Sequence, residues 1–379
     1  MRVLSVVGAR PQFVKAGPVS RVLRTRHSEL LVHTGQHYDD AMSGAFFREL
    51  QIPEPDANLE VGSGSHAAMT AEMLRRLEPL VERHAPDVIL VYGDTNSTLA
   101  ASVVGCKVVY ADGAQPLLAH VEAGLRSFNP RMPEERNRIV ADHLSDLLLA
   151  PTPAAMGNLA REGLGERAEL VGDVMVDAYL VAAERADGSV LPEPARQRSG
   201  YLLLTLHRAE NVDDPLRLRA WLDAFDLPEQ PVIFPVHPRT AAVMARFGLR
   251  PPENVVAMKP VGYPTMVALE RQARAVATDS GGVQKEAYLA GVPCLTLRGE
   301  TEWIETVEAG WNRLVPASRT AVRAALADRG FLDRRRPRPP LFGDGRTAER
   351  IVDVLERAVA ARRSPPRPRG EAVLEPTAS

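Results

Sequence analysis

The sequence predicts an α/β protein built from two Rossmann-like domains that face each other across a cleft. Short apolar runs alternate with amphipathic segments from the first residues onward, which is typical of strands buried on both faces of a parallel sheet and of the helices between them. The alternation breaks in an Ala-, Arg-, Pro- and Gly-rich stretch at residues 183–200 and then restarts. A chain of 379 residues is also long for one core and comfortable for two.

The first half of the chain is expected to form one doubly wound sheet with right-handed crossovers. Its expected strands are the apolar runs 3–7, 29–33, 88–92, 117–121 and 147–150. Its expected helices have apolar residues at helical spacing and cover 13–24, 67–84, 97–104 and 137–144. Pro86 ends the second of these helices, because proline lacks the N–H that a helix interior requires.

The second half repeats the pattern. Its expected strands cover 201–206, 231–236, 255–258, 275–278 and 294–297. Its expected helices cover 215–224, 263–272, 283–290 and, after a Gly-rich turn, 346–361. We therefore expect an N-terminal domain at 1–171, a C-terminal domain at 172–344 and a final helix at 345–362. Residues 363–379 hold little that could be buried and are expected to be disordered.

Composition excludes several functional classes. A net charge of −2 argues against nucleic acid or a membrane as a partner, since both favour a basic surface. The sequence has neither a signal peptide nor a run that could span a bilayer, so we expect a cytoplasmic protein. Its two cysteines show no metal-ligand spacing. The first loop also lacks the Gly-x-Gly-x-x-Gly pattern, so neither a metal nor a nicotinamide or flavin cofactor is expected.

Acidic residues follow two of the expected strands. Asp94 comes just after 88–92 and Glu122 just after 117–121, and Glu134 lies a dozen residues further, beyond a turn rich in Asn and Pro. The carboxyl ends of parallel strands form the edge of the sheet where ligands bind. Carboxylates in a cleft are the usual groups for moving protons at carbon or oxygen, so the pattern predicts an enzyme of that kind.

Two strand–helix turns have the features of anion sites. Arg10 and Lys15 lie near the start of the first helix, where the free N–H groups of a helix N-terminus favour an anion. In the second half, Ser280 can cap the following helix, and the adjacent Gly281 and Gly282 let the backbone approach a phosphate closely. Glu286 lies one helical turn further, where a carboxylate could bind a ribose diol. Either site could instead be an ordinary turn with solvated side chains.

Histidines also follow expected strands. His207 comes directly after a buried run and could hydrogen-bond a phosphate or act as an acid, although a histidine that satisfies local backbone groups would look the same. His237 is similarly placed and more ambiguous. Gln36 and His37 follow the second expected strand, and their spacing alone assigns no chemistry.

Taken in order, these motifs resemble those of the non-hydrolysing UDP-N-acetylglucosamine 2-epimerase family, over nearly the whole chain. The matching strings are Gly8-Ala9-Arg10-Pro11, Gly93-Asp94-Thr95, His120-Val121-Glu122-Ala123-Gly124-Leu125-Arg126, Pro133-Glu134-Glu135-x-Asn137-Arg138, His207-Arg208-x-Glu210, Thr278-Asp279-Ser280-Gly281-Gly282-x-Gln284-x-Glu286 and Gly343-Asp344-Gly345. The resemblance implies a fold of the glycosyltransferase-B type, with the last helix crossing back to the first domain. It also implies a homodimer that acts on a UDP-sugar without metal or nicotinamide.

The resemblance further implies a reaction and roles for residues. A base removes the proton at C2 of the sugar while UDP leaves by anti elimination, and UDP then adds back to the 2-acetamidoglucal as C2 is protonated from the other face. The acid–base candidates that the resemblance gives are Asp94, Glu122 and Glu134. His207 matches the histidine at the leaving phosphate, and Glu286 matches the ribose contact. The matching diphosphate contacts are Arg10, Lys15, Ser280, Gly281 and Gly282. Parts of a site for an activating second substrate molecule match Gln36, His37, Arg208 and His237.

One departure bears on the substrate. Many family members read Thr-Glu-Arg-Pro-Glu where this chain has Thr301-Glu302-Trp303-Ile304-Glu305, so a contact between that arginine and the sugar nucleotide is in doubt. The tryptophan version looks closer to the branch that acts on UDP-2,3-diacetamido-2,3-dideoxy-glucuronate. The sequence also leaves open a hydrolysing epimerase that releases N-acetylmannosamine and UDP, a glycosyltransferase and a non-catalytic sugar-nucleotide binder.

Overall fold

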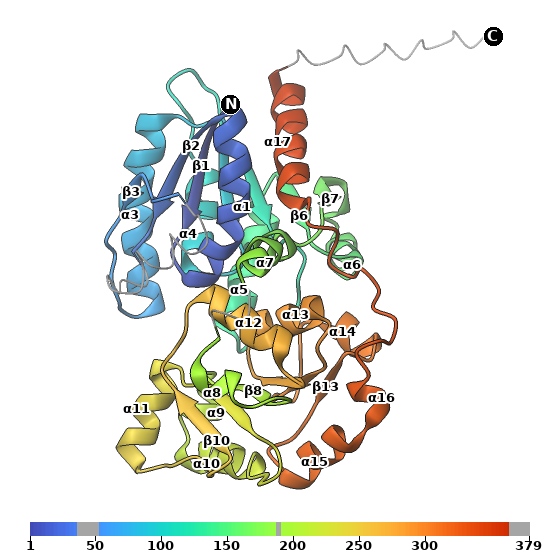
Figure 1. Cartoon of the computed structure of the whole chain (residues 1–379). Helices are drawn as coiled ribbons and strands as arrows, with labels where there is room; N and C mark the ends of the chain where they lie inside the picture. The colour runs from blue at the N-terminus through green and yellow to red at the C-terminus, as the bar shows by residue number, and fades with distance from the viewer. Residues whose placement is uncertain (36–52, 187–190, 364–379) are drawn as a thin grey trace, which may run out of the picture.

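Two parallel β-sheets with helices packed on them form the body of the computed structural model, which describes residues 1–35, 53–186 and 191–363 (Figure 1). The first sheet lies in the N-terminal half and the second in the C-terminal half, and every strand pairing in either sheet is parallel. The α/β fold class that the sequence predicts is confirmed. The exact domain boundaries that we expect from the sequence stay a prediction.

Within the described residues, the first sheet has seven strands in the order β3-β2-β1-β4-β5-β6-β7. Its strands are β1 (Arg2–Val7), β2 (Ser28–His33), β3 (Ala57–Asn58), β4 (Val88–Tyr92), β5 (Leu117–Val121), β6 (Leu147–Ala150) and β7 (Ala168–Leu170). The helices between them are α1 (Arg10–Arg26), α3 (His66–His84), α4 (Asn96–Gly105), α5 (Pro133–Leu144), α6 (Pro153–Arg161) and the 3-10 turn η1 (Gly165–Arg167). The strands and helices expected here from apolar patterning are confirmed, whereas the edge strands β3 and β7 are too short and too exposed to give such a pattern.

The second sheet, as far as the chain is described, has six strands in the order β10-β9-β8-β11-β12-β13. Its strands are β8 (Leu202–Thr205), β9 (Val232–Pro235), β10 (Val255–Met258), β11 (Ala275–Thr278), β12 (Cys294–Thr296) and β13 (Asn312–Leu314). Its helices are α8 (Glu193–Arg196), α9 (Ala209–Val212), α10 (Pro215–Ala224), α11 (Pro238–Phe247), α12 (Tyr263–Gln272), α13 (Gly281–Ala290), α14 (Ile304–Glu308), α15 (Arg319–Ala327) and α16 (Arg329–Leu332). In the first sheet the strand order reverses at β1, and in the second sheet it reverses at β8. In open α/β sheets, ligands bind at the carboxyl ends of the strands beside such a reversal.

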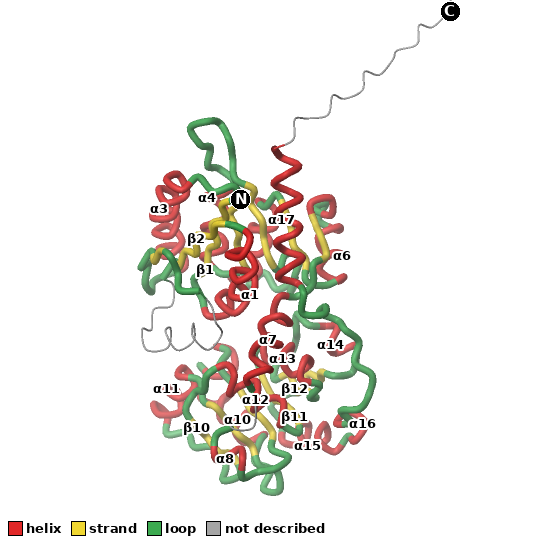
Figure 2. Tube along the Cα trace, turned by 45° about the horizontal axis from the view of Figure 1, so that its top comes forward, coloured by secondary structure: helices red, strands yellow, loops and turns green. Residues whose placement is uncertain are grey.

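Two helices connect the halves. Helix α7 (Val174–Arg185) packs against α1 of the first half and against α12 of the second. Helix α17 (Thr347–Arg363) follows the second domain in sequence but lies beside α1 and β5 (Figure 1, Figure 2). The sequence predicts α17 and only the end of α7. The predicted disordered tail falls, from residue 364 on, outside the described residues.

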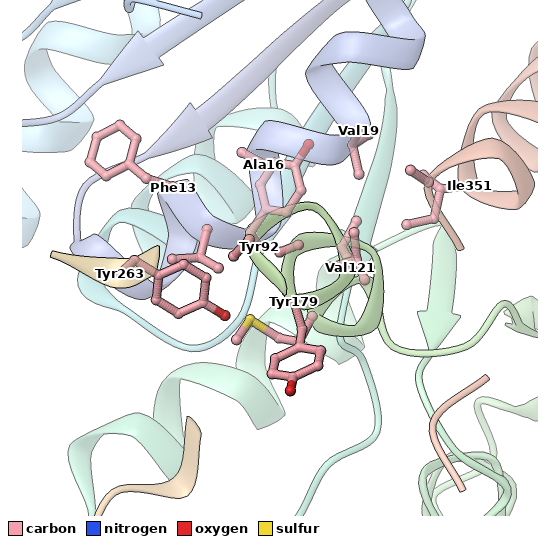
Figure 3. Packing of buried hydrophobic residues seen from close by; sticks show 14 of the residues in the cluster. Phe13, Ala16, Val19, Tyr92, Val121, Tyr179, Tyr263 and Ile351 are labelled. Atoms are coloured by element: carbon pink, nitrogen blue, oxygen red, sulfur yellow. The ribbon is translucent and has the colours of Figure 1, made fainter. Parts of the chain in front are cut away.

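One hydrophobic cluster runs through this junction (Figure 3). It contains Phe13 of α1, Tyr92 of β4, Tyr179 of α7, Tyr263 of α12 and Ile351 of α17, all of them buried. A cluster that takes side chains from both halves fixes how the two sheets face each other, because separating the halves would return this apolar surface to water.

The start of α17 is held by a side chain of α7. Both carboxylate oxygens of the buried Asp177 accept hydrogen bonds from backbone N–H groups at the start of α17, those of Thr347 at 3.2 Å and Ala348 at 2.9 Å. Burial raises the pKa of Asp177 despite these hydrogen bonds. The carboxyl group satisfies N–H groups that a helix start otherwise leaves without a partner.

No helix within the described ranges has both the length and the apolar character that crossing a membrane would need.

We expect Ile351→Ala to destabilise the protein by about 2–5 kcal/mol, because Ile351 is fully buried in the junction cluster and its removal leaves a cavity. The free energy of unfolding from denaturant titration measures this. Arg346→Ala, at an exposed position just before the same helix, should change it by no more than about 0.5 kcal/mol. Equal effects of the two substitutions would mean that α17 does not share the core of the first domain.

Candidate active site

The carboxyl ends of the two sheets meet through side-chain contacts. Lys285, in the first turns of α13, reaches Glu122 after β5, and its Nζ lies 3.5 Å from the Glu122 Oε1. Asn129 Nδ2, in the loop before α5, donates to Glu300 Oε1, in the loop after β12, at 3.3 Å. The residues that follow the central strands of both sheets therefore line one region between the halves.

The loop after β1 is held by Gln12. Its Oε1 accepts from the backbone N–H groups of Gly8 at 2.8 Å and Ala9 at 3.1 Å, and its Nε2 donates to Tyr92 O at 2.7 Å. This ties the start of α1 to the end of β4 and places Lys15, one turn into α1, beside Glu122. The structure describes the backbone of Arg10 at the first position of α1, and its side chain is outside the description.

Glu122 is held in an unusual backbone conformation. It has a φ of +72°, in the left-handed region that non-glycine residues rarely adopt, directly after the last residue of β5. The adjacent Gly93 has a φ of +60°, and a Cβ atom there would lie 3.2 Å from Lys15 Nζ and 3.3 Å from Glu122 Oε2. Strained backbone of this kind is concentrated at functional sites, and here it turns the carboxylate toward the lysine.

The Glu122 carboxylate is ionised because two ammonium groups face it. Burial alone would raise the pKa of Glu122, but the charges of Lys15 and Lys285 outweigh the burial and lower the pKa to about 2. Lys15 forms an ion pair with Glu122 Oε2, and Lys285 approaches Oε1. A carboxylate with so low a pKa is a weak base as long as both cations stay in place.

Lys285 is buried, with 3% of its side chain exposed. Its ammonium pairs with Asp173, the N-cap of α7, and lies 4.1 Å from the centre of the Trp303 ring. Burial alone would lower the pKa of Lys285, but Asp173 and Glu122 outweigh it and raise the pKa. The lysine is therefore a fixed positive charge with two carboxylates and an aromatic face around it.

Asp94 is linked to α5 through Arg138. The Arg138 guanidinium forms ion pairs with Asp94 after β4 and with Glu135 one turn before it in α5. Burial alone would lower the pKa of Arg138, and the two carboxylates together raise it. Asn137 Nδ2 also donates to the backbone carbonyl of Asp94 at 3.0 Å, so the β4 loop and α5 form one rigid unit.

The two adjacent glutamates at the start of α5 differ. Glu135 is buried and accepts hydrogen bonds from the backbone N–H groups of Ser127 at 3.0 Å and Phe128 at 2.9 Å. Phe128 has a φ of +57°, so Glu135 holds a strained turn in place. Burial alone would raise the pKa of Glu135, and its hydrogen bonds and Arg138 lower it. Glu134 is exposed in the same turn, and its carboxylate is thus the more accessible to a ligand.

On the other side, Asp279 organises the loop after β8. Its carboxylate accepts from the backbone N–H groups of His207 at 3.1 Å and Arg208 at 3.0 Å, and from Asn211 Nδ2 at 3.1 Å. His207 Nδ1 lies 3.3 Å from the same carboxylate, and its ring lies 5.3 Å from that of His237. Burial lowers the pKa of His207 against the opposing charge of Asp279, which favours the neutral imidazole.

The turn before α13 forms a capped helix start. Ser280 caps the helix by accepting from Val283 N at 3.4 Å, as the sequence predicts. A Cβ atom on Gly281 would collide with the Glu302 carboxylate and lie 3.3 Å from Trp303 Nε1, so a larger residue there would require Glu302 to move. Glu286 lies one turn further along α13 and is buried. Burial, and after it the charge of Glu286, raise the pKa of the fully buried Glu270.

Within the described ranges, no group of three His, Cys, Asp or Glu side chains gathers as metal ligands would.

The structure brings many of the predicted site residues together. Lys15 and Glu122 are in contact, and Asp94 is joined to the same region through Arg138, which also acts on Glu122. Arg208, assigned by resemblance to an activator site, lies 3.7 Å from Glu302 at the glycine turn. Gln36 and His37 fall outside the described residues.

Sequence reasoning missed the residues that connect the predicted ones. The residues concerned are Glu135, Arg138, Asp173, Asp279 and Lys285. Glu135, Arg138 and Asp279 stand inside the motifs, but nothing in the spacing tells a supporting side chain from one that meets a ligand. Lys285 occupies an undefined position of the glycine-turn motif, and its partners lie far from it in sequence.

Comparison with known proteins gives a consistent result. A family model described as UDP-N-acetylglucosamine 2-epimerase matches residues 22–356. A UDP-N-acetylglucosamine 2-epimerase homolog of Methanococcus maripaludis is 44% identical over 94% of this chain and 99% of its own length. The UDP-2,3-diacetamido-2,3-dideoxy-D-glucuronate 2-epimerase of Pseudomonas aeruginosa is 43% identical over 94% of this chain and 99% of its own length.

Solved structures agree. The UDP-GlcNAc 2-epimerase of Methanocaldococcus jannaschii, in complex with UDP-GlcNAc and UDP, is 39% identical, with a TM-score of 0.83 over 94% of this chain and all of its own. The calicheamicin glycosyltransferase CalG4 is 18% identical, with a TM-score of 0.56 over 96% of this chain and 99% of its own, and this likeness shows the fold alone. The fold is of the glycosyltransferase-B type.

We expect Glu135→Gln to lower the free energy of unfolding by about 1–3 kcal/mol. The substitution removes a buried negative charge that pairs with Arg138 and accepts hydrogen bonds from two backbone N–H groups. Glu134→Gln, one residue away and exposed, should change stability by no more than about 0.5 kcal/mol. Thermal and denaturant unfolding of both variants measure the difference. If Glu134→Gln were the more destabilising of the two, the burial of Glu135 would not have the role described.

Proposed function

This chain belongs to the UDP-N-acetylglucosamine 2-epimerase family, and we propose that it interconverts UDP-N-acetylglucosamine and UDP-N-acetylmannosamine without hydrolysis. Membership of the family makes it an isomerase. The observation that carries the proposal is the ionised, buried Glu122, which faces cations from both domains at the edge where a sugar nucleotide would lie. The M. jannaschii relative, with 39% identity, was solved with this UDP-sugar bound.

The proposed reaction has two stages. A carboxylate takes the proton from C2 while the C1–O bond to UDP breaks, with the bonding electrons leaving on the diphosphate, to give 2-acetamidoglucal and UDP. UDP then adds back at C1 while C2 receives a proton on its opposite face. Since the C2 proton is only weakly acidic, its removal must be coupled to the departure of the diphosphate, whose growing charge needs cations and N–H groups.

Inversion at C2 requires proton-transfer groups on both faces of the sugar, and three carboxylates are proposed for them. Glu122 follows β5, Asp94 follows β4, and Glu134 is exposed at the start of α5. The three carboxylates come from three different elements of the first domain. Their different origins support the proposal that they approach a sugar from different sides.

The second domain and the start of α1 are proposed to hold UDP. The N-terminus of α13, with Ser280, Gly281 and Gly282, offers backbone N–H groups to the diphosphate, and Glu286 follows for the ribose. Lys15 would add a positive charge from the first domain, and Arg10 a second. His207, neutral beside Asp279, is proposed to meet the leaving phosphate.

The activator site that the resemblance implies is also a proposal. Arg208 and His237 are the described members of that site: Arg208 follows His207 in the chain, and the His237 ring lies 5.3 Å from that of His207. Its remaining members, Gln36 and His37, are outside the described residues. We further propose a homodimer that acts in the cytoplasm, which rests on the resemblance.

A second candidate substrate is UDP-2,3-diacetamido-2,3-dideoxy-D-glucuronate. It is favoured by the 43% identity to the P. aeruginosa epimerase named for it, and by Trp303, which stands where many family members have arginine. The chemistry at C2 would be the same. The two substrates differ at C3 and C6, where the second carries an acetamido and a carboxylate group.

Incubation of the protein with UDP-N-acetylglucosamine in D2O, followed by proton NMR, tests the proposal. We expect UDP-N-acetylmannosamine with deuterium at C2 and no free sugar, because the proton returned to C2 comes from a group that exchanges with solvent. Free N-acetylmannosamine with UDP would identify a hydrolysing epimerase. No change with this sugar, followed by exchange with the diacetamido-glucuronate, would move the assignment to the second substrate.

We expect Asp94→Asn and Glu122→Gln each to reduce turnover by about 10²- to 10⁴-fold while UDP still binds, since each amide keeps the shape of the carboxylate and loses its basicity. Turnover from the NMR assay and UDP affinity from calorimetry measure the two effects separately. Glu166→Gln, exposed in the turn η1, is the matched control and should keep wild-type turnover. Near-normal turnover in both site variants would contradict the acid–base assignment.

A further inference from the structure

Glu122 is bound by two lysines that are held in different ways. Lys285 is clamped, because its ammonium also pairs with Asp173 and lies over the Trp303 ring, and only 3% of its side chain is exposed. Lys15 reaches Glu122 from the start of α1, and 12% of its side chain is exposed. Of the two cations, Lys15 is therefore the less firmly held.

We propose that Lys285 is a positioning residue that holds Glu122 throughout the reaction, while Lys15 leaves Glu122 for the diphosphate of the bound substrate. This inference rests on the proposed function of the same site. It assigns to Lys285 a role that the motifs of the sequence do not give, and it makes substrate binding itself the event that makes Glu122 a stronger base.

The charges of the cluster support this exchange. Glu122 and Asp173 carry two negative charges, and Lys15 and Lys285 two positive ones, so the cluster is balanced. A diphosphate adds negative charge beside α1 and competes for the more exposed ammonium. Once Lys15 has moved, one clamped lysine faces Glu122, and the affinity of this buried carboxylate for a proton rises. A base is more effective as its pKa approaches the working pH.

Arg138 also faces Glu122, and it does not change which cation is the more easily displaced. Arg138 from α5 also lowers the pKa of Glu122, but its guanidinium is already paired with Asp94 and Glu135. It is therefore as firmly held as Lys285.

Trp303 fits this role of Lys285. Its ring gives the ammonium a neutral, electron-rich surface at 4.1 Å. An arginine at position 303 would instead place a second positive charge against a lysine that is almost fully buried. The tryptophan and the lysine are thus two parts of one arrangement, and the departure at 303 is explained by the residue at 285.

The test compares Lys285→Met with Lys285→Arg in the C2-exchange assay. Lys285→Met should lower kcat by about 10- to 100-fold with KM within about threefold of the wild type, because Glu122 loses the group that positions it while the UDP contacts stay in place. The acidic limb of kcat/KM should move upward by about 1–3 pH units, since a buried carboxylate that loses a nearby cation binds its proton more tightly. Lys285→Arg keeps the positive charge. It should restore most of kcat and return the acidic limb of kcat/KM to its wild-type pH.

A second readout needs no turnover. UDP binding to Lys285→Met, measured by calorimetry near pH 6 in buffers of different ionisation enthalpy, should take up more protons than binding to the wild type. Lys15 leaves a carboxylate that no longer has Lys285, so that carboxylate binds a proton. The extra uptake should vanish in Lys285→Met/Glu122→Gln, the matched control that separates Glu122 from the titrating phosphate. Lys285→Met leaves the buried Asp173 carboxylate without its partner, and the single variant could unfold for that reason. The double variant Asp173→Asn/Lys285→Met removes this unpaired charge, so the same measurement can be made on it.

A folded Lys285→Met protein with wild-type kcat, pH limb and proton uptake would overturn the proposal, as would a Lys285→Arg protein no better than Lys285→Met. A wild-type protein that exchanges no C2 proton with either UDP-sugar would instead contradict the proposed function. In that case the proton uptake on UDP binding still decides whether Lys285 and Lys15 share Glu122 in the manner inferred.

Discussion

The pairing of a buried carboxylate with lysines from both halves of the chain is the interaction on which the site depends. Burial by itself raises the pKa of Glu122, and the charges of nearby cations outweigh it. Lys15 comes from the first half and Lys285 from the second, so cations from both halves contribute to the low pKa of Glu122. The hydrophobic cluster at α7 and α17 holds the two halves together, and Asp173, at the start of α7, holds Lys285 at its far side.

Both domains have the same architecture, and their strand ends carry different chemistry. After β4 and β5 the first domain presents carboxylates that are braced by Arg138 and by the start of α5. After β8 and β11 the second domain presents backbone N–H groups, glycines and a histidine, which suit an anionic leaving group. A glycosyltransferase with the same fold is only 18% identical, so the fold by itself does not decide the reaction. The proposal of proton transfer at carbon rests on the carboxylates of the first domain.

Several side chains act by shaping the loops that carry others. Gln12 fixes the loop after β1, Glu135 holds the strained turn at Phe128, and Asp279 holds the loop of His207. Each of them is buried, and each accepts or donates several hydrogen bonds to backbone groups that no regular element satisfies. The positions proposed for catalysis are more exposed, or sit in strained backbone beside them, as Glu134 and Glu122 do. The buried residues therefore support the loops that carry the positions proposed for catalysis.

The sequence by itself determined the two doubly wound sheets, the ordered motifs at their strand ends and the family, because apolar periodicity and turn chemistry are local properties of the chain. It placed Lys15, Glu122 and Ser280 at the correct edges, and it identified Ser280 as a helix cap. It did not reveal β3, β7 or β13, which are short, nor the full length of α7. Only the tertiary structure decided that Glu135 is buried while Glu134 is exposed, and that Lys285 reaches Glu122 and Asp173. Such pairs join residues more than a hundred positions apart, and they exist only once the apolar junction has brought two separately patterned halves together.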